Sequence, residues 1–160
     1  MLEVLTAQDV FSFLRPDQVN AISEASEKVS YVAGETVYTE GARAECFFTI
    51  LEGAVELRLR GKDGSGILID QLTKGAMFGS CVCFSRDCYA LTARCTEDSE
   101  LLKVQNAALR DLMDDDLVMG YALQTRISEV YFNRYIQTME KLQGGGGSSS
   151  SRLHQYLTAP

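Results

Sequence analysis

Residues 73–95 read TKGAMFGSCVCFSRDCYALTARC, and the rest of the chain is arranged around this stretch. Phe78-Gly79-Ser80 predicts one short helical turn, and the run from Tyr89 to Thr92 predicts a return to a strand. The backbone N–H groups at a helix start beside a glycine form a cradle for anions. The stretch therefore indicates an anion-binding loop between two strands.

The residues before this stretch have the pattern of short β-strands from Ser30 onward. Runs rich in β-branched and aromatic residues alternate with glycines, and they lie at 31–32, 36–38, 47–51, 55–60 and 67–69. Gly53 is expected to turn one hairpin and Asp63-Gly64 another. Regularly spaced short strands with glycine turns predict a sandwich or a barrel.

Helical segments are predicted at both ends of the chain. Residues 1–29 have helical character, and Pro16 followed by Asp17 suits a helix start. Near the other end, Asn106 suits an N-cap for a helix through Met113. Residues 117–142 carry apolar residues every three or four positions and predict one long helix.

Four segments together resemble the cyclic nucleotide-binding domain family, which includes the sensor domains of catabolite-activator-type regulators. Residues 31–41 are similar to the opening strands of that family, 47–57 to its central hairpin, 73–95 to its phosphate-binding cassette and 98–104 to its last strand. The resemblance extends over residues 5–142. It implies a mainly β fold, a jelly-roll β-sandwich with flanking N- and C-terminal helices.

The resemblance also implies that the cassette is degenerate. In this family a glutamate after Phe-Gly holds the ribose, and an arginine pairs with the cyclic phosphate. By position, Ser80 replaces that glutamate and Tyr89 replaces that arginine. Loss of the arginine removes a charge-assisted contact that a buried phosphate needs. The cassette residues singled out are Phe78, Gly79, Ser80, Cys81, Arg86, Tyr89, Ala90 and Thr92.

The altered cassette makes cyclic AMP and cyclic GMP disfavoured ligands, and no cofactor is expected. Cysteines stand at positions 46, 81, 83, 88 and 95, and we interpret them as reduced, packed thiols rather than as a metal site. A redox or metal sensor is the third-ranked interpretation. The one histidine, His154, lies beyond the Gly/Ser run at 144–151, so no Cys–His or Ser–His pair is expected within the folded domain and no enzyme is predicted.

Charge and hydropathy limit the partners. The formal net charge is −7, which argues against a nucleic-acid-binding face. The sequence contains neither an apolar run long enough to span a bilayer nor a signal pattern, so we expect a cytoplasmic protein without a membrane partner. A homodimer through the 117–142 helix remains an open alternative.

Residues 144–151 are four glycines followed by four serines, which is the composition of a flexible, engineered linker. We therefore divide the chain into a cyclic nucleotide-binding-like domain at 1–143, this linker, and a fused peptide segment at 152–160. Leu153, Tyr156 and Leu157 share one face of a helical turn, as peptide anchors for an apolar groove do. The alternative for this segment is an expression remnant.

These features predict a non-catalytic regulatory or adaptor module that recognises a short peptide of a partner protein, here fused as residues 152–160. The alternative is a small-ligand sensor in which Arg86 or Arg94 holds a cyclic nucleotide or a related nucleotide in the altered cassette.

Overall fold

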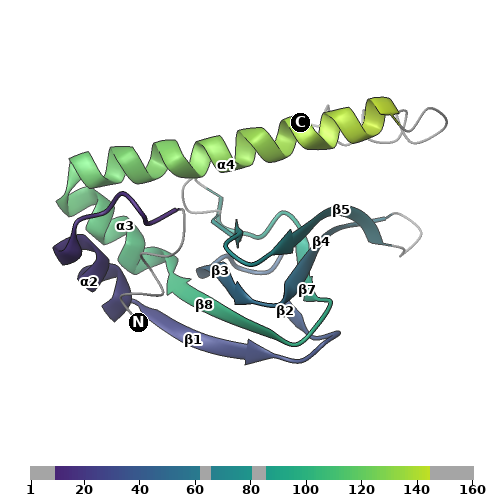
Figure 1. Ribbon diagram of the computed structural model, residues 1–160, viewed down its shortest axis with the longest axis horizontal. Helices are drawn as coiled ribbons and strands as arrows, with labels where there is room; N and C mark the ends of the chain where they lie inside the picture. The colour runs from purple at the N-terminus through teal and green to yellow at the C-terminus, as the bar shows by residue number, and fades with distance from the viewer. Residues whose placement is uncertain (1–9, 62–65, 81–85, 145–160) are drawn as a thin grey trace. The chain divides into compact units, whose positions relative to one another are not determined.

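The computed structural model describes residues 10–61, 66–80 and 86–144, and the chain divides into two units, residues 1–127 and 128–160. The first unit contains two antiparallel four-stranded sheets (Figure 1). Sheet A has the order β1 (Ser26–Tyr31), β8 (Ser99–Gln105), β3 (Cys46–Glu52) and β6 (Met77–Phe78). Sheet B has the order β2 (Thr36–Tyr38), β7 (Thr92–Cys95), β4 (Ala54–Arg60) and β5 (Gly66–Thr73). The predicted β-sandwich is confirmed.

One apolar cluster joins the two sheets. Alternate residues of a strand point to the same face, so Cys46, Phe48 and Ile50 of β3 share the interior with residues of sheet B. Each large apolar side chain buried here contributes about 1.5–3 kcal/mol. The cluster consists of Cys46, Phe48, Ile50, Val55, Leu57, Leu72, Phe78, Ala93, Cys95 and Leu101.

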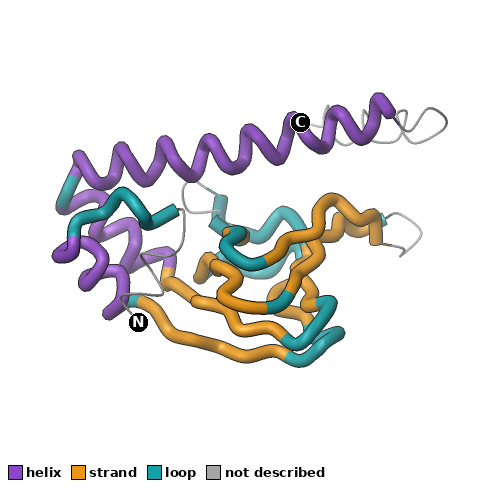
Figure 2. Tube along the Cα trace, in the orientation of Figure 1, coloured by secondary structure: helices purple, strands orange, loops and turns teal. Residues whose placement is uncertain are grey.

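A second apolar layer lies on the other face of sheet A. Phe47 points away from the sandwich interior, and its ring centroid lies 6.0 Å from that of Phe11 in the turn at residues 10–14. Helices α2 (Pro16–Glu24) and α3 (Asn106–Asp115) lie side by side next to the sheets (Figure 2). The helical side chains buried within the first unit include Val19, Ile22, Leu109, Met119, Leu123 and Ile127.

The prediction that residues 1–29 are helical holds for α2 but is wrong on both sides of that helix. Residues 10–14 form turns, and residues 1–9 lie outside the described residues. After α2, Ser26–Tyr31 forms β1, which pairs with β8 from Ser26↔Val104 to Tyr31↔Ser99. The β8 edge offers backbone donors and acceptors to these residues, and this non-local ladder outweighs a weak local helical tendency.

Three further local predictions are corrected. Asn106 is the first residue of α3 and not its N-cap, because its side chain donates from Nδ2 to the Ala44 carbonyl at 2.9 Å. Phe78 ends strand β6 instead of starting a helical turn, because its backbone pairs with Phe48 of β3. Strand β7 begins at Thr92, not at Tyr89. The predicted Asp63-Gly64 turn lies outside the described residues.

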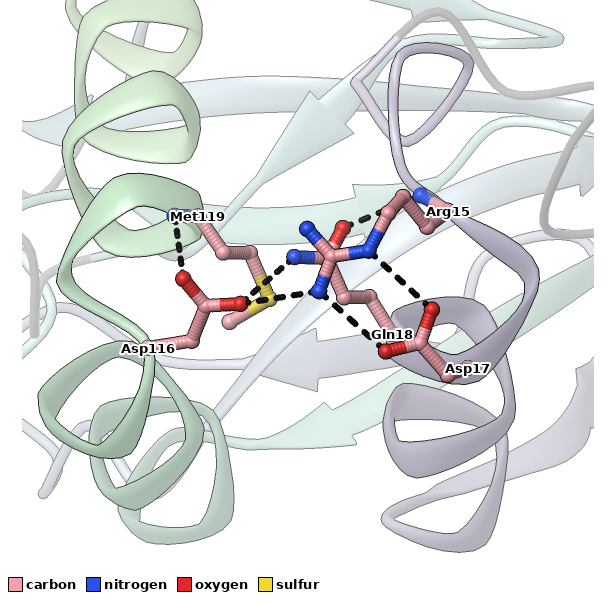
Figure 3. A network of polar contacts seen from close by, with 5 residues as sticks. All are labelled: Arg15, Asp17, Gln18, Asp116 and Met119. Carbon is pink, nitrogen blue, oxygen red and sulfur yellow. Dashed lines mark hydrogen bonds and ion pairs between the residues drawn. The ribbon is translucent and has the colours of Figure 1, made fainter.

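A polar network ties α2 to the junction between α3 and α4 (Leu117–Gly144) (Figure 3). The Asp116 carboxylate accepts hydrogen bonds from the Met119 N–H at 3.0 Å and from Gln18 Nε2 at 2.8 Å. It also accepts one from the Arg15 guanidinium at 3.2 Å. These donors, the Met119 N–H first, hold the pKa of the Asp116 carboxyl below its usual value. Asp116 thus caps the start of α4 while holding α2 in place.

The second unit contains the remainder of α4. The predicted long helix over 117–142 is confirmed and extends to Gly144. Phe132 and Tyr135 are 63 % and 52 % exposed there. Within the described residues, none of the helices combines the length and apolar character that a bilayer crossing requires. Most of the predicted linker and the whole peptide segment at 152–160 lie outside the described residues.

The β3–β4 turn gives the first testable prediction. Gly53 has φ +93°, and a Cβ atom there would lie 2.6 Å from the Asp98 carbonyl oxygen and 2.7 Å from Ser99 Cα. Gly41 has φ +82° but open space around it. Gly41→Ala should therefore cost only the backbone strain, about 1–3 kcal/mol, and Gly53→Ala clearly more because backbone must also move. Urea unfolding measures both, and equal losses would contradict the steric argument.

Candidate functional site

The described part of the cassette begins where strand β6 ends. Phe78 and Ser80 are fully buried, and Gly79 between them has φ +80°. A glycine is favoured here because other residues rarely adopt this conformation. Cys81 lies outside the described residues, and the chain is described again from Arg86. The structure therefore places the first three cassette residues at the interior edge of sheet A.

Tyr89 reaches this edge with its hydroxyl group. The hydroxyl donates to the Cys46 carbonyl oxygen at 2.6 Å and accepts from the Cys46 N–H at 3.2 Å. Residues two apart in a strand direct their backbone groups to the same side, and Phe48 already pairs with Phe78 of β6. At Cys46, where β6 has ended, the Tyr89 hydroxyl supplies the hydrogen bonds that another strand residue would make.

The Tyr89 ring lies flat against the ring of Tyr38 in β2. Their centroids are 3.6 Å apart with an interplanar angle of 9°. A Cβ atom at Gly79 would lie 3.2 Å from Tyr38 Cε1 and 3.3 Å from Tyr89 Cε1. The space on that side of Gly79 is therefore filled by the two rings, and even a methyl group would crowd them.

Backbone hydrogen bonds hold Tyr89 in this position. The Gly41 N–H donates to the Tyr89 carbonyl, and the Tyr89 N–H donates to the Ala42 carbonyl, each at 2.9 Å. Arg43 and Cys88 form an isolated antiparallel bridge beside them. The segment at 87–89 thus runs along residues 41–44, and this pairing sets the direction of the Tyr89 side chain.

The remaining predicted residues lie in different environments. Ala90 is exposed, whereas Thr92 is half-buried and its Oγ1 accepts from the Glu40 N–H at 3.0 Å. Arg94 donates from Nε to the Gly34 carbonyl at 2.9 Å, in the loop between β1 and β2. Arg86 is exposed and lines a groove outside the sandwich. The structure brings Phe78, Gly79, Ser80 and Tyr89 together and places Ala90, Arg86 and Arg94 elsewhere.

The thiols divide into two kinds. Cys46 and Cys95 are buried in the sandwich core, and burial raises the pKa of both thiols. The prediction of packed thiols is confirmed for these two and is wrong for Cys88, which is exposed. Cys81 and Cys83 lie outside the described residues. Among the residues that are described, no three His, Cys, Asp or Glu side chains gather as a metal site would require.

The sequence did not reveal the partners of Tyr89. Tyr38 was recognised only as part of a strand, and the backbone of Cys46 lies 43 residues before Tyr89. The one available signal was the replacement of an expected arginine by an aromatic residue, which needs an apolar neighbour when buried.

Comparison with known proteins identifies the class. The family model of the cyclic nucleotide-binding domain matches residues 28–116, more than half of the 160 residues, and the chain therefore belongs to this family. A solved structure from Geobacter metallireducens of the cyclic nucleotide-binding class superposes with a TM-score of 0.74 at 25 % identity, over 83 % of this chain and 96 % of that one.

Two curated relatives are regulatory proteins. A CRP-like cAMP-activated global transcriptional regulator of Mycobacterium tuberculosis is 24 % identical over 115 residues, which cover 72 % of this chain and 51 % of the regulator. A cAMP-dependent protein kinase regulatory subunit of Dictyostelium discoideum is 23 % identical, over 88 % of this chain and 43 % of the subunit. The chain thus spans about half the length of these relatives.

The Tyr89 hydroxyl gives the second prediction. Tyr89→Phe keeps the ring stack but leaves the N–H and the carbonyl of the buried Cys46 without this partner, so it should destabilise the domain by about 1–3 kcal/mol. Amide hydrogen exchange at Cys46 should accelerate in the same variant. Tyr121→Phe is the control, because Tyr121 is 78 % exposed. Similar stability of the two variants would show that the hydroxyl contributes little.

Proposed function

We propose that this domain is a non-catalytic regulatory module that recognises a short peptide of a partner protein, and that cyclic nucleotides are not its main ligands. The observation that carries the proposal against a cyclic nucleotide is the stacked pair of Tyr38 and Tyr89 beside Gly79, whereas the peptide part rests on the segment at 152–160. A phosphate bound to the backbone at Gly79 would need to displace part of this pair. Family membership supports the regulatory role, since the relatives described above are regulators.

Electrostatics favour the same conclusion. A cyclic phosphate carries one negative charge, and a buried anion requires charged or strongly polar partners. Tyr89 is a neutral phenol whose hydroxyl already bonds Cys46. A charge-assisted hydrogen bond contributes about 1.5–3 kcal/mol, so replacing an arginine by this phenol lowers nucleotide affinity by roughly ten- to a hundredfold.

The alternative function is a small-ligand sensor in which Arg86 or Arg94 holds a nucleotide. The geometry gives this alternative less support. Arg94 donates to the Gly34 carbonyl in the β1–β2 loop, and Arg86 is an exposed residue beside the outer groove. Either arginine would need to turn inward, and the tyrosine pair would need to separate.

Titration calorimetry with cyclic nucleotides tests the cassette. Cyclic AMP and cyclic GMP should bind the chain in the high micromolar to millimolar range, about −4 to −6 kcal/mol. Tyr89→Arg combined with Ser80→Glu should tighten binding, because it restores the phosphate and ribose partners that the family resemblance implies. Tyr89→Phe combined with Ser80→Glu is the matched control, since it keeps the ring and should not tighten binding. Submicromolar binding by the unchanged chain would contradict the degenerate cassette.

The proposed peptide is the segment at 152–160, with Leu153, Tyr156 and Leu157 as its anchors. Burying each large apolar side chain contributes about 1.5–3 kcal/mol before ordering costs are subtracted. A tether of Gly/Ser composition also raises the effective concentration of the peptide to roughly the millimolar range. A weak contact would therefore be well populated within the fused chain.

Amide chemical shifts test this peptide contact. Replacing Tyr156 and Leu157 by Ala in the full chain should shift amides of the domain that lie far from the substitutions, because docking is lost. A variant with Thr158→Ala, which lies outside the anchor face, is the control. If the domain amides are unchanged by the double substitution, residues 152–160 are a remnant and the peptide-binding proposal loses its main support.

A homodimer through residues 117–142 is compatible with this function. Val118 and Tyr121 of α4 are 77 % and 78 % exposed in the first unit, and Phe132 is 63 % exposed in the second. Large apolar side chains left in contact with water on a helix favour association with a second surface.

A further inference from the structure

Strand β1 forms one edge of sheet A (Figure 1). Within the described residues, β8 is the one strand that pairs with it. A strand at such an edge presents a row of backbone N–H and C=O groups to which an extended chain can pair. The pairing of β1 with β8 is regular over all six residues, and the strand contains no proline or glycine. β1 therefore lacks the bulges and prolines that commonly protect an edge.

The alternation of hydrogen bonds in this ladder defines which groups of β1 point outward. The Gln105 N–H donates to the Ala25 carbonyl at 3.3 Å, so these two residues form a hydrogen-bonded pair. Bonded and non-bonded pairs alternate along an antiparallel ladder, and Lys28 and Ser30 therefore direct their backbone N–H and C=O groups away from β8. Within the part of the chain that the structure describes, these outward groups have no partner.

The free edge ends at Val32, two residues beyond Ser30. The Val32 N–H donates to the Glu35 carboxylate at 2.7 Å, and the Val32 carbonyl accepts from the Glu35 N–H at 3.0 Å. Both bonds are made on the outward side of the strand, as the alternation of the ladder requires. The Glu35 carboxylate therefore lies in line with the free backbone groups of β1.

The other edges of the two sheets are short or protected within the described residues. Strands β6 and β2 have two and three residues. Strand β5 has eight, but the register of its pairing with β4 shifts between Leu57 and Arg58. The Gly66 carbonyl of β5 accepts from the Arg58 guanidinium, and its Gln71 N–H donates to the Asp70 carboxylate, each at 2.9 Å. Among these edges, β1 is therefore the one best suited to pair with another chain.

A groove of about 400 Å³ lies beside the last residues of β1. Its lining includes the carboxylates of Glu35, Glu52, Asp98 and Glu100 and no basic side chain. Two of these carboxylates accept backbone N–H groups, but none of the four is ion-paired among the described residues. Glu52 and Glu100 also stand at directly opposed positions of β3 and β8, where two like charges are unfavourable. A cationic side chain placed here would relieve this repulsion.

We infer that an extended, basic segment of a partner protein pairs with β1 as a fifth strand of sheet A. The free backbone groups of Lys28 and Ser30 supply the main-chain hydrogen bonds. Antiparallel pairing is slightly more stable than parallel pairing, so the amino-terminal end of the segment lies at the groove. A Lys or Arg at that end meets Glu35 and Glu100, whereas the exposed Lys28 would repel it farther along β1.

A second copy of the chain suits this edge less well than a basic segment does. Each copy carries a formal net charge of −7. Antiparallel pairing of two β1 strands would also bring the start of one strand, where Glu27 lies, toward the acidic groove of the other. The segment at 152–160 is a different ligand, because its anchors share one face of a helical turn. The inference therefore goes beyond the proposed function and does not depend on docking of that segment.

Amide exchange with water, measured by NMR on the full chain, tests the free edge. The probe is the peptide acetyl-Arg-Thr-Val-Thr-Val-Thr-amide. Without peptide, the amides of Lys28 and Ser30 should exchange much faster than those of Glu27 and Val29, which bond to β8. At about ten times the Kd of the peptide, exchange at Lys28 and Ser30 should slow about tenfold. Exchange that is already slow without peptide, or that slows with protein concentration alone, would overturn the inference.

Two altered peptides separate the backbone contacts from the charge. N-methylation of the two central residues removes N–H groups and blocks the ladder, so it should weaken binding about tenfold or more. Glu in place of Arg keeps the strand but reverses the charge, and it should weaken binding about threefold or more. If the N-methylated peptide binds as tightly as the probe, the edge of β1 is not the site. If the Glu peptide does, the inferred basic segment is wrong.

Variants of the chain test the groove. Glu35→Gln combined with Glu100→Gln should weaken binding of the probe about threefold or more and leave the Glu peptide no weaker. Gln at position 35 retains an acceptor for the Val32 N–H. Asp115→Asn removes an exposed carboxylate outside the groove lining and should leave both affinities unchanged. An unchanged preference for Arg over Glu in the double variant would contradict the role of the groove. The proposed function is tested separately, by substitutions within 152–160.

Discussion

The hydrogen bonds between the Tyr89 hydroxyl and the backbone of Cys46 are the constraint on which the site depends. Buried backbone groups must be paired, and β6 ends before it can pair with Cys46. The Tyr89 hydroxyl meets this requirement from a different segment of the chain. It thereby fixes the Tyr89 ring against Tyr38, and the two rings occupy the space beside Gly79. A requirement of sheet formation thus decides which side chains lie beside Gly79.

The fold and the recognition of a phosphate depend differently on whether position 89 carries a charged side chain or a phenol. The sandwich depends on the apolar cluster between the sheets, to which Tyr89 does not belong, although Tyr38 packs at its edge. A phenol in place of a charged group can therefore be accommodated without loss of the fold, because apolar burial is non-directional. Recognition of a phosphate depends on directed, charged contacts and does not tolerate the same replacement. This difference is the physical basis for proposing a regulatory module with a partner other than a cyclic nucleotide.

Contacts at its two ends hold α3 in position. Asp116 follows α3 and accepts hydrogen bonds from Gln18 and Arg15, so the end of this helix is held by α2. The start of α3 is held by Asn106, which donates to the Ala44 carbonyl. With both ends anchored in this way, α3 is held in a defined position beside the sheets.

The amino-acid sequence by itself determined strands β2 to β5, the Gly53 hairpin and the long helix that begins at Leu117. Alternation with period two, glycines at turns and helical spacing are local sequence patterns. Such patterns were sufficient to predict these elements. The resemblance to the family indicated that Tyr89 stands at the position of the arginine that pairs with the cyclic phosphate. Only the tertiary structure decided that Ser26–Tyr31 is a strand and where the Tyr89 ring lies, because both depend on partners distant in sequence. The same holds for the groove at the end of β1, whose walls come from three separate segments that meet only when the sheets have formed.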